Sequence, residues 1–237
     1  MTSVEAFYRR PGTIDDLVYN HVVVRNEYRV PDRLRSDAVI VDIGAHIGSF
    51  SYLALTRGAG KVYSFEPQLE NFAQAQRNLA PFGPRVELRP VALWRSDVVA
   101  PQLHFWPSSD RANTGGGTLI WDTDGPMVDA APFDDAVEAI TRDGSRISLM
   151  KLDCEGAEFP ILLTSKHLDR IERIVGEYHE LKADLPRHVR VADVDQFAVE
   201  HLVACLERAG FVVSYEKQAT GIYGDMGLFF AERPISG

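Results

Sequence analysis

Two acidic residues that follow short apolar runs near the start of the chain are the residues best suited to chemistry. Asp42 ends an apolar run that begins at Val39, and Glu66 ends a second run that begins at Val62. Glu66 lies 24 positions after Asp42. The glycine-containing turn Gly44–Gly48 lies between them and opens a segment of helical character. A strand, turn, helix and second strand of this length form one βαβ unit, in which the second acid can accept the hydroxyls of a ribose.

The turn between these acids favours a cationic nucleotide over a nicotinamide dinucleotide. Dinucleotide-binding turns follow the pattern G-x-G-x-x-G, which lets a pyrophosphate reach the helix N-terminus. Here the spacing is Gly44-x-x-x-Gly48, and His46 stands where a middle glycine would be. Asp42 would repel a pyrophosphate but suits the sulfonium and ammonium groups of S-adenosylmethionine. An NAD-dependent oxidoreductase, a non-catalytic nucleotide-binding module and a buried turn without a ligand remain alternatives.

A second group of acids follows a later apolar run. Within Lys151–Glu158, the acids Asp153, Glu155 and Glu158 come directly after the predicted strand Ile147–Leu152. Ligands of open α/β sheets bind outside the carboxyl ends of the strands, so we expect these acids in the same crevice as the first two. Carboxylates there suit a sulfonium ligand, a general base or a divalent cation. The plainer alternative for Glu158 is that it complements a helix N-terminus.

The next predicted strand, Ile171–Tyr178, brings Glu177 and His179 to the same edge of the sheet. Residues two apart on an extended strand share a face, so these side chains are expected side by side. His179 is then a candidate proton acceptor near neutral pH. A lone histidine is more often structural, and that alternative stays open.

Strand-like and helical patterns alternate along most of the chain. A helix is predicted over Leu69–Leu79, a third strand over Val86–Leu88, a helix over Asp193–Ala209 that Gly210 caps, and a last pair of strands over Phe211–Tyr215 and Gly227–Ala231. The connection between the last two strands leaves no room for a helix, so they form an antiparallel hairpin. The pattern predicts an α/β, Rossmann-like three-layer sandwich with a mostly parallel seven-stranded sheet, which is the plan of class I methyltransferases.

Residues 101–132 interrupt this alternation. Two short strand-like runs, Leu103–Trp106 and Thr118–Trp121, are separated by polar residues and by Gly115–Gly117, which predicts an inserted β-hairpin. The three glycines are equally consistent with a plain loop and with a gate that faces the substrate. The polar residues 1–37 are expected to form a cap or lid, ahead of a methyltransferase domain over residues 38–237.

Composition narrows the class of protein and its surroundings. With 237 residues, 45% of them hydrophobic, the chain can bury a full core, and a single cofactor-binding domain is expected. A net charge of -9 argues against a nucleic-acid substrate, which leaves a small-molecule acceptor. The absence of a long apolar run or signal peptide predicts a cytoplasmic protein without a membrane partner. Cys154 and Cys205 are expected to be reduced thiols, and a homo-oligomer is left open.

Five motifs occur in a fixed order along the chain. They are Val41–Ser49, Phe65–Pro67, Val91–Leu93, Asn113–Gly115 and, as the most specific, Lys151–Glu158. Together, from about Ala38 to Ala231, they resemble the FkbM family of S-adenosylmethionine-dependent methyltransferases. His46 departs from the asparagine that is common in that family. The resemblance implies O-methylation, often of sugars, cyclitols, polyketides or other natural-product scaffolds.

The resemblance also implies a set of cofactor-binding residues at the strand ends. They are Asp42, Gly44, His46, Gly48, Ser49, Phe50, Glu66, Pro67, Ala92 and Asp153. The turn would hold the amino-acid end of the cofactor, Glu66 would bind the ribose hydroxyls, and Ala92 would lie near the adenine. Asp153 would lie between the methyl donor and the acceptor.

The expected reaction is an in-line transfer of the sulfonium methyl group to a nucleophilic oxygen, in which the protein aligns the reactants and excludes water. An alcohol acceptor needs a base, and Asp153, Glu155 and His179 are the predicted catalytic residues. A Mg²⁺ ion held by Asp153, Glu155 or Glu180 is another way to activate the acceptor. The sequence leaves the metal unassigned.

Overall fold

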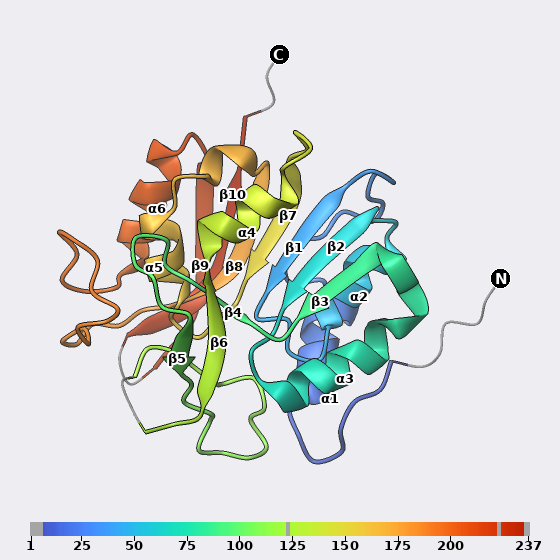
Figure 1. Cartoon of the computed structure of the whole chain (residues 1–237), viewed down its shortest axis with the longest axis horizontal. Coiled ribbons are helices and arrows are strands. Elements are labelled where there is room, and N and C mark those ends of the chain that lie inside the picture. Colours follow the sequence, from blue (N-terminus) through green and yellow to red (C-terminus); the bar gives the residue numbers. More distant parts are fainter. Residues whose placement is uncertain (1–6, 122–123, 222–223, 235–237) are drawn as a thin grey trace.

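The central element of the molecule is a seven-stranded sheet; the computed structural model describes residues 7–121, 124–221 and 224–234. Its strands are β1 (Val39–Ile43), β2 (Lys61–Phe65), β3 (Val86–Arg89), β7 (Ile147–Leu152), β8 (Arg173–His179), β9 (Val212–Thr220) and β10 (Asp225–Glu232). They lie in the order β3-β2-β1-β7-β8-β10-β9, and only β10 runs antiparallel to its neighbours (Figure 1). The predicted α/β sheet with a terminal antiparallel hairpin is therefore confirmed.

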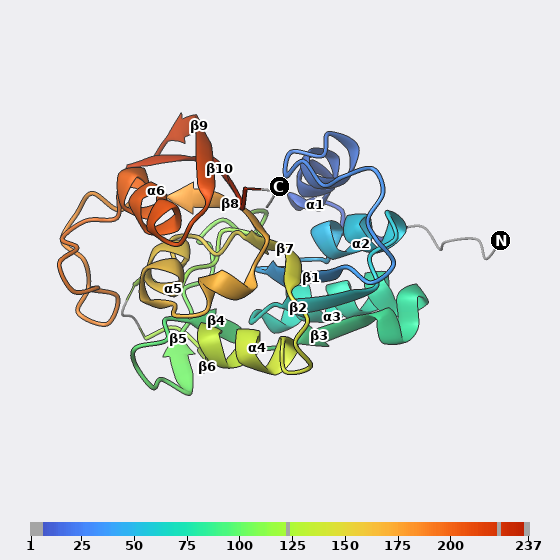
Figure 2. The ribbon, with the colours of Figure 1, turned by 90° about the horizontal axis from the view of Figure 1, so that it is seen from above.

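Helices cover both faces of this sheet (Figure 2). They are α1 (Asp15–Tyr19), α2 (Ser49–Thr56), α3 (Leu69–Leu79), α4 (Phe133–Ile140), α5 (Glu158–Thr164) and α6 (Val199–Arg208), with shorter helical turns at Asn20–Val24, Ala80–Arg85 and Leu168–Arg170. Since successive strand residues face opposite sides, Ile40 enters the core shared with α2 and α3, whereas Val41 enters the core shared with α4, α5 and α6. Among the described residues, no helix is both long and apolar enough to cross a membrane.

The segment before β1 packs into the core beside α2 and also contacts the insertion. Val22, Tyr28 and Val30 are buried in the core shared with α2, and the Tyr28 ring packs edge-on against Phe50 at 5.8 Å between centroids. Ahead of them, Ile14 lies against the insertion, where its backbone N–H donates to the carbonyl of Ala112. The segment predicted as a cap therefore contributes apolar packing to one layer of the sandwich.

The insertion forms a second, three-stranded sheet whose pairing differs from the predicted hairpin. In this sheet β6 (Met127–Pro132) lies between β4 (Ala92–Trp94), to which it is parallel, and β5 (Gln102–His104), to which it is antiparallel. Within the described residues, the predicted partner run Thr118–Trp121 makes a single bridge, from Thr118 to Trp106. Leu119 and Ile120 are both buried, so this run fills the core and cannot serve as an edge strand whose alternate residues face solvent.

Two helices also differ from the sequence-based expectation. The helix predicted from Asp193 begins only at Val199, because Phe197 is held in an isolated bridge to Leu181 and stacks on Phe159 at 4.8 Å. The helical spacing of its apolar residues therefore continues into a segment that packs in an extended form. Gly210 ends the helix as predicted, with a φ of +88°. Helix α4 follows β6 directly and was not predicted.

Candidate cofactor-binding and acceptor site

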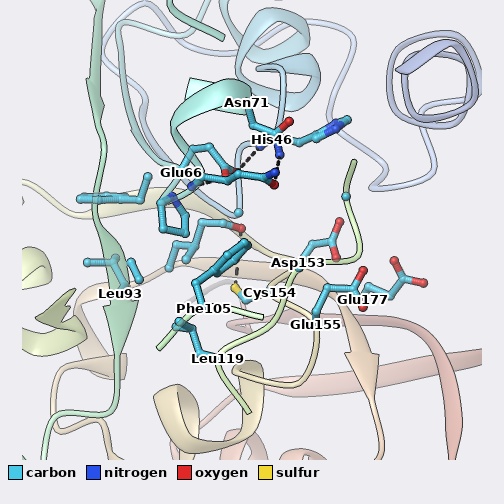
Figure 3. A pocket seen from close by; sticks show the side chains of 18 of the residues that line it. His46, Glu66, Asn71, Leu93, Phe105, Leu119, Asp153, Cys154, Glu155 and Glu177 are labelled. Carbon is cyan, nitrogen blue, oxygen red and sulfur yellow. Dashed lines mark hydrogen bonds between the residues drawn. The ribbon is translucent and has the colours of Figure 1, made fainter. Parts of the chain in front are cut away.

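A cavity of about 190 Å³ lies at the carboxyl ends of β1, β2, β7 and β8, where an open α/β sheet usually binds its ligand. Its lining differs in chemistry from one side to the other (Figure 3). Leu93, Phe105 and Leu119 form what we term the apolar end, and Asp153, Glu155 and Glu177 form the acidic end. Of the four strand-end acids expected to face one crevice, Glu66, Asp153 and Glu177 line this cavity, whereas Asp42 does not.

The predicted cofactor-binding residues divide into two groups. Gly44, His46, Glu66, Pro67, Ala92 and Asp153 line the cavity. Asp42, Gly48, Ser49 and Phe50 lie outside its lining, because they are packed beneath the turn or at the start of α2. Direct contact with a ligand is therefore expected from the first group, and support of the turn from the second.

Glu66 is a buried carboxylate that the backbone holds in place. It accepts hydrogen bonds from the backbone N–H groups of His46 at 2.7 Å and Gln68 at 2.9 Å. Burial raises the pKa of Glu66 to about 7, even though these two hydrogen bonds favour its ionised form. The group is fixed in position and close to its titration point at neutral pH, so a cationic or hydrogen-bonding ligand can complete its ionisation.

The turn after β1 needs glycine because two chain segments meet there. Gly44 has a φ of +74°, and a Cβ atom at this residue would lie 1.9 Å from the backbone oxygen of Asp153. The N–H groups of Gly44 and Ala45 both donate to the carbonyl of Phe65 at 3.0 Å. The turn thereby joins the ends of β1, β2 and β7, and it fixes Asp153 relative to Glu66.

Lys151 supports this turn from below, and the sequence reasoning gave it no role. Its ammonium group donates to the carbonyl of Gly44 at 2.6 Å and lies 3.4 Å from Asp42 and 3.7 Å from Asp153. Burial alone would lower the pKa of Lys151, but the charges of Asp42 and Asp153 outweigh it, and the pKa is raised. Asp42 also accepts from the N–H and hydroxyl of Ser51. The sequence does carry a signal for this role, because Lys151 is a charged residue within an apolar strand and lies next to acids.

The ring of His46 contacts the N-terminal segment and the insertion. Its Nε2 lies 2.8 Å from the Thr114 hydroxyl and 3.5 Å from a carboxylate oxygen of Asp15. Burial lowers the pKa of His46 to about 4, so the ring is neutral at physiological pH. Its backbone N–H is the group that reaches Glu66. His46 lies in the turn, as expected, but its side chain contacts the N-terminal segment and the insertion.

A polar cluster that we term the clasp joins three segments above the turn. Asp15 accepts from the guanidinium of Arg10 at 2.8 Å and from the Thr114 hydroxyl at 3.1 Å. Asn71, on α3, donates to the carbonyl of Thr114 at 2.8 Å and accepts from Arg10 at 2.8 Å. The clasp holds the N-terminal segment and the insertion against the cavity, and it pairs residues too far apart in sequence to be linked by spacing.

At and next to the acidic end, the carboxylates of two acids already accept hydrogen bonds from neighbouring protein groups. Asp153 accepts a hydrogen bond from the Tyr28 hydroxyl at 3.0 Å, in addition to its contact with Lys151. Glu158 is fully buried and accepts from the backbone N–H groups of Cys154 at 2.5 Å and Gly156 at 2.9 Å. The structural alternative for Glu158, at the start of α5, is the one observed.

His179 lies between two of these acids. Its ring nitrogens are 3.5 Å from Glu155 and 3.5 Å from Glu158. Burial lowers the pKa of His179, but the charges of Glu158, Glu155 and Glu177 outweigh it and raise the pKa well above its usual range. An imidazolium cannot accept a proton, so the predicted role of His179 as a base at neutral pH conflicts with its surroundings. Burial raises the pKa of Glu155 to about 7.

The suggested metal ligands do not gather around one point. Glu180 accepts from the backbone N–H groups of Val199 at 3.0 Å and Asp225 at 2.9 Å, and its carboxylate also pairs with Lys182. It therefore caps α6. A cationic His179 is not a metal ligand either, because coordination requires the neutral ring. Asp153, Glu177 and His179 each place one potential ligand atom within 4.8 Å of the others, but His179 would have to lose its charge to coordinate an ion, so a Mg²⁺ cofactor is not supported.

A second hollow of about 350 Å³, which we term the groove, lies beside the cavity. Alternate residues of one segment of the insertion separate the two spaces: Gly115, Gly117 and Leu119 line the cavity, and Gly116, Thr118 and Ile120 line the groove. Glu155 lines both. A Cβ atom at Gly117 would lie 2.2 Å from the Phe105 ring, so glycine keeps this wall thin. Trp106, which is 43% exposed, and Trp121 also line the groove.

Fold and site together define the class of protein. The strand order, the antiparallel final hairpin and a cavity at the carboxyl ends of the strands are those of a Rossmann-like, S-adenosylmethionine-binding class I methyltransferase. Residues 42–213 match the family model described as "Methyltransferase FkbM domain". The chain therefore belongs to the FkbM methyltransferase family, as its motifs predicted, and the nicotinamide oxidoreductase is no longer an alternative.

Individual proteins are similar to this chain at sequence identities of 27% or less. It is 27% identical over 184 residues to Methyltransferase 1 of Beauveria bassiana (strain ARSEF 2860), which covers 69% of this chain and 73% of that protein. It is 26% identical to the AMB antimetabolite synthetase AmbE of Pseudomonas aeruginosa, over 92% of this chain but only 12% of that synthetase. Among solved structures, an rRNA methylase from Streptococcus thermophilus has a TM-score of 0.47 with 16% identity, over 96% of this chain and 99% of the other.

Proposed function

We propose that this protein binds S-adenosylmethionine in the cavity and catalyses methyl transfer to an oxygen of a small molecule held in the groove. The acceptor class we favour is a sugar, cyclitol, polyketide or other natural-product scaffold. The observation that carries the proposal is the division of one cavity into an apolar end, a carboxylate fixed by backbone N–H groups, and an acidic end. When bound, S-adenosylmethionine supplies an electrophilic methyl group on a positively charged sulfur.

The residues present fit such a ligand along its length. Ala92, Leu93 and Phe105 offer apolar surface for an adenine ring. Glu66, held by two backbone N–H groups, would accept hydrogen bonds from the ribose hydroxyls. Asp153 and the turn at Gly44 would hold the methionine end, where the negative charge suits an ammonium and a sulfonium group.

The groove supports a small and uncharged acceptor. Trp106 offers an exposed ring for stacking, and Ser108 and Ser109 offer hydroxyls for hydrogen bonds. No lysine or arginine of the described chain lines the groove, and the protein carries a net charge of -9. A phosphate-rich acceptor would meet repulsion there. The name of one relative, an antimetabolite synthetase, also favours a natural-product scaffold.

Catalysis is proposed to depend mainly on alignment, with carboxylates at the junction of the two spaces. Glu155 lines both the cavity and the groove, and Asp153 lines the cavity beside it. The two residues would orient the acceptor hydroxyl and stabilise positive charge near it. His179 would contribute by holding Glu155 through their charges.

Binding and turnover experiments test the proposal in order. Titration calorimetry should show that S-adenosylmethionine and S-adenosylhomocysteine bind and that NAD does not. A screen of hydroxylated small molecules, read by S-adenosylhomocysteine release, should then identify an acceptor, and NMR of the product should place the new methyl group on oxygen. Methylation of nitrogen or carbon would contradict the O-methylation. Binding of the cofactor without turnover on any hydroxylated compound would favour a non-catalytic module.

Metal dependence is tested on the same acceptor. Turnover after stringent chelation is expected to equal that of the untreated protein, because Asp153, Glu155 and Glu180, the suggested metal ligands, are already paired with Lys151, His179 and a backbone N–H group. Restoration of a lost activity by added Mg²⁺ would show that a metal activates the acceptor instead.

A further inference from the structure

Glu177 has a place at the acidic end that the proposed function leaves unused. It lies near the end of β8, and its side chain lines the cavity beside Asp153 and Glu155 (Figure 3). This is the side of the cavity where the methyl donor and the groove would meet, since Glu155 lines both spaces. The inference below rests on the proposed function and adds a residue to its chemistry.

The acids that line the cavity differ in what already binds them. Glu66 accepts from two backbone N–H groups, and Asp153 accepts from the Tyr28 hydroxyl and lies beside Lys151. Glu155 faces the His179 cation at 3.5 Å. For Glu177, no hydrogen bond and no ion pair is found within residues 7–121, 124–221 and 224–234. Both of its oxygens are therefore available to a ligand in the cavity.

The surroundings of Glu177 make its carboxylate unusually basic. Burial, and then the negative charge of Asp153, raise the pKa of Glu177 to about 8. The other charged or titratable groups that face it are Glu155, on the turn after β7, Glu158 on α5, His179 on β8 and Tyr28 from the N-terminal segment. A carboxylate with a pKa near the working pH and without other partners is suited to accept a proton.

We infer that Glu177 is the catalytic base that receives the proton of the acceptor hydroxyl. The hydroxyl O–H bond breaks and its proton moves to a carboxylate oxygen of Glu177, while the hydroxyl oxygen forms its bond to the methyl carbon. The electron pair of the breaking carbon–sulfur bond remains on sulfur, which becomes neutral. Glu177 later passes the proton to solvent. Asp153 and Glu155, which already have partners, orient the acceptor, and His179 keeps Glu155 in position.

The first test separates proton transfer from binding. Glu177→Gln keeps the size of the side chain but removes the base, so kcat with the acceptor found by screening should fall about 10²- to 10⁴-fold. The Kd for S-adenosylhomocysteine, which lacks the sulfonium charge, should stay within about threefold, and this unchanged affinity shows that the variant is folded. Glu172→Gln, just before β8 and outside the cavity lining, is the matched control and should retain full activity. A Glu177→Gln kcat within about threefold of wild type overturns the inference.

The second test needs no acceptor. A sulfonium near Glu177 should favour its ionised form, so wild-type protein at pH 7.5 should release more protons on binding S-adenosylmethionine than on binding S-adenosylhomocysteine. Calorimetry in two buffers of different ionisation enthalpy measures this difference, and Glu177→Gln should reduce it to the part that Glu66 and Glu155 contribute. An unchanged difference in Glu177→Gln overturns the inference.

Two further results would separate this inference from the proposed function. If wild-type protein binds neither form of the cofactor, the proposed function itself fails. If wild-type turnover is lost on chelation and restored by a divalent ion, Glu177 serves a metal and is not the base, while methyl transfer stands. Activity of Glu177→Asp between those of wild type and Glu177→Gln would support the inference, since a shorter carboxylate retains the base at a greater distance.

Discussion

Glu66 and Glu177 are the same kind of side chain in the same cavity, yet their surroundings suit them to different tasks. Glu66 directly follows β2 and Glu177 lies near the end of β8, and burial raises the pKa of Glu66 to about 7 and that of Glu177 to about 8. Glu66 is fixed by the N–H groups of His46 and Gln68, whereas Glu177 has no such donor in the described structure. Fixed donors hold a carboxylate in one geometry for binding, and their absence leaves its lone pairs free for proton transfer.

The largest expected effect tests whether one turn sets the geometry of both regions. Gly44→Ala places a Cβ atom 1.9 Å from the backbone oxygen of Asp153, so it should lower the free energy of unfolding by about 3 kcal/mol or more and abolish cofactor binding. Gly12→Ala is the matched control, because Gly12 has the same φ of +74° and no atom within 4 Å of the added Cβ. It should cost only about 1 kcal/mol. Equal losses in denaturant titrations of the two variants would contradict the steric explanation.

The next effect compares the two glutamates directly. Glu66→Gln should weaken S-adenosylhomocysteine binding about 10- to 100-fold, because charge-assisted hydrogen bonds contribute about 1.5–3 kcal/mol each. Glu177→Gln should change the same Kd less than about threefold. Glu70→Gln, on α3 and outside the cavity lining, controls for the loss of a surface charge. Calorimetry on the three variants measures these Kd values. A similar loss of affinity in Glu66→Gln and Glu177→Gln would contradict the assignment of binding to Glu66 and proton transfer to Glu177.

Replacement of His179 tests whether this side chain is a structural cation or the base. His179→Gln should lower the free energy of unfolding by about 2 kcal/mol, because Glu155 and Glu158 lose the positive charge between them. The Kd for S-adenosylhomocysteine should stay within about threefold of wild type. The variant should also keep the pH dependence of kcat that Glu177 produces. Loss of that dependence in His179→Gln, with stability unchanged, would identify His179 as the base.

A smaller effect concerns pH and the three cavity-lining glutamates whose pKa values are raised, Glu66, Glu155 and Glu177. A positively charged ligand favours their ionised forms, so affinity for S-adenosylmethionine should rise about tenfold from pH 5.5 to 7.5, as Glu66 and Glu155 titrate near 7. Titration of Glu177 near 8 extends the rise. Calorimetry across this range measures it. Glu66→Gln should show a flatter rise, and an affinity independent of pH in wild-type protein would contradict the assignment.

The same shifts fix the sign of the stability change without ligand. A carboxyl whose folded pKa is raised contributes stability below its unfolded pKa of about 4.5, and this contribution is lost as the pH rises through the folded value. The raised pKa of His179 acts in the same direction, since its stabilisation is lost at high pH. The ligand-free protein should therefore lose stability from pH 5 to 8.5. Added S-adenosylmethionine should offset this loss in thermal unfolding measurements.

The comparison also shows what the sequence can and cannot predict. Parallel strands bring their carboxyl ends to one edge, so the meeting of Glu66, Asp153 and Glu177 follows from strand order alone. The pairing of Lys151 with Asp42 does not, because it depends on the register between β1 and β7. Which acid has donors and which has none depends on backbone geometry after each strand. For that reason the sequence predicts the base among Asp153, Glu155 and His179 and not at Glu177.

The insertion was predicted less well than the sheet for a related reason. Period-two patterns identify strands only where one face is solvent-exposed, and Leu119 and Ile120 are both buried. The true partner strand, Met127–Pro132, has a mixed composition that lacked a clear alternation. The clasp was also missed, because Asp15 and Thr114 lie 99 positions apart. Long-range polar contacts of this kind leave no periodic signal.

The smallest expected effect is at His46, where the backbone and the side chain serve different segments. His46→Asn keeps the backbone N–H that Glu66 accepts, so the Kd for S-adenosylhomocysteine should change less than about threefold. The shorter side chain should lose its contact with Thr114, at a cost of about 1 kcal/mol in the free energy of unfolding. Thr114→Val removes the other side of that contact and also the hydrogen bond from Thr114 to Asp15, so the double variant should be little less stable than Thr114→Val alone. A large loss of affinity in His46→Asn alone would mean that the ring itself binds the cofactor, and the binding region would then extend from Glu66 into the clasp.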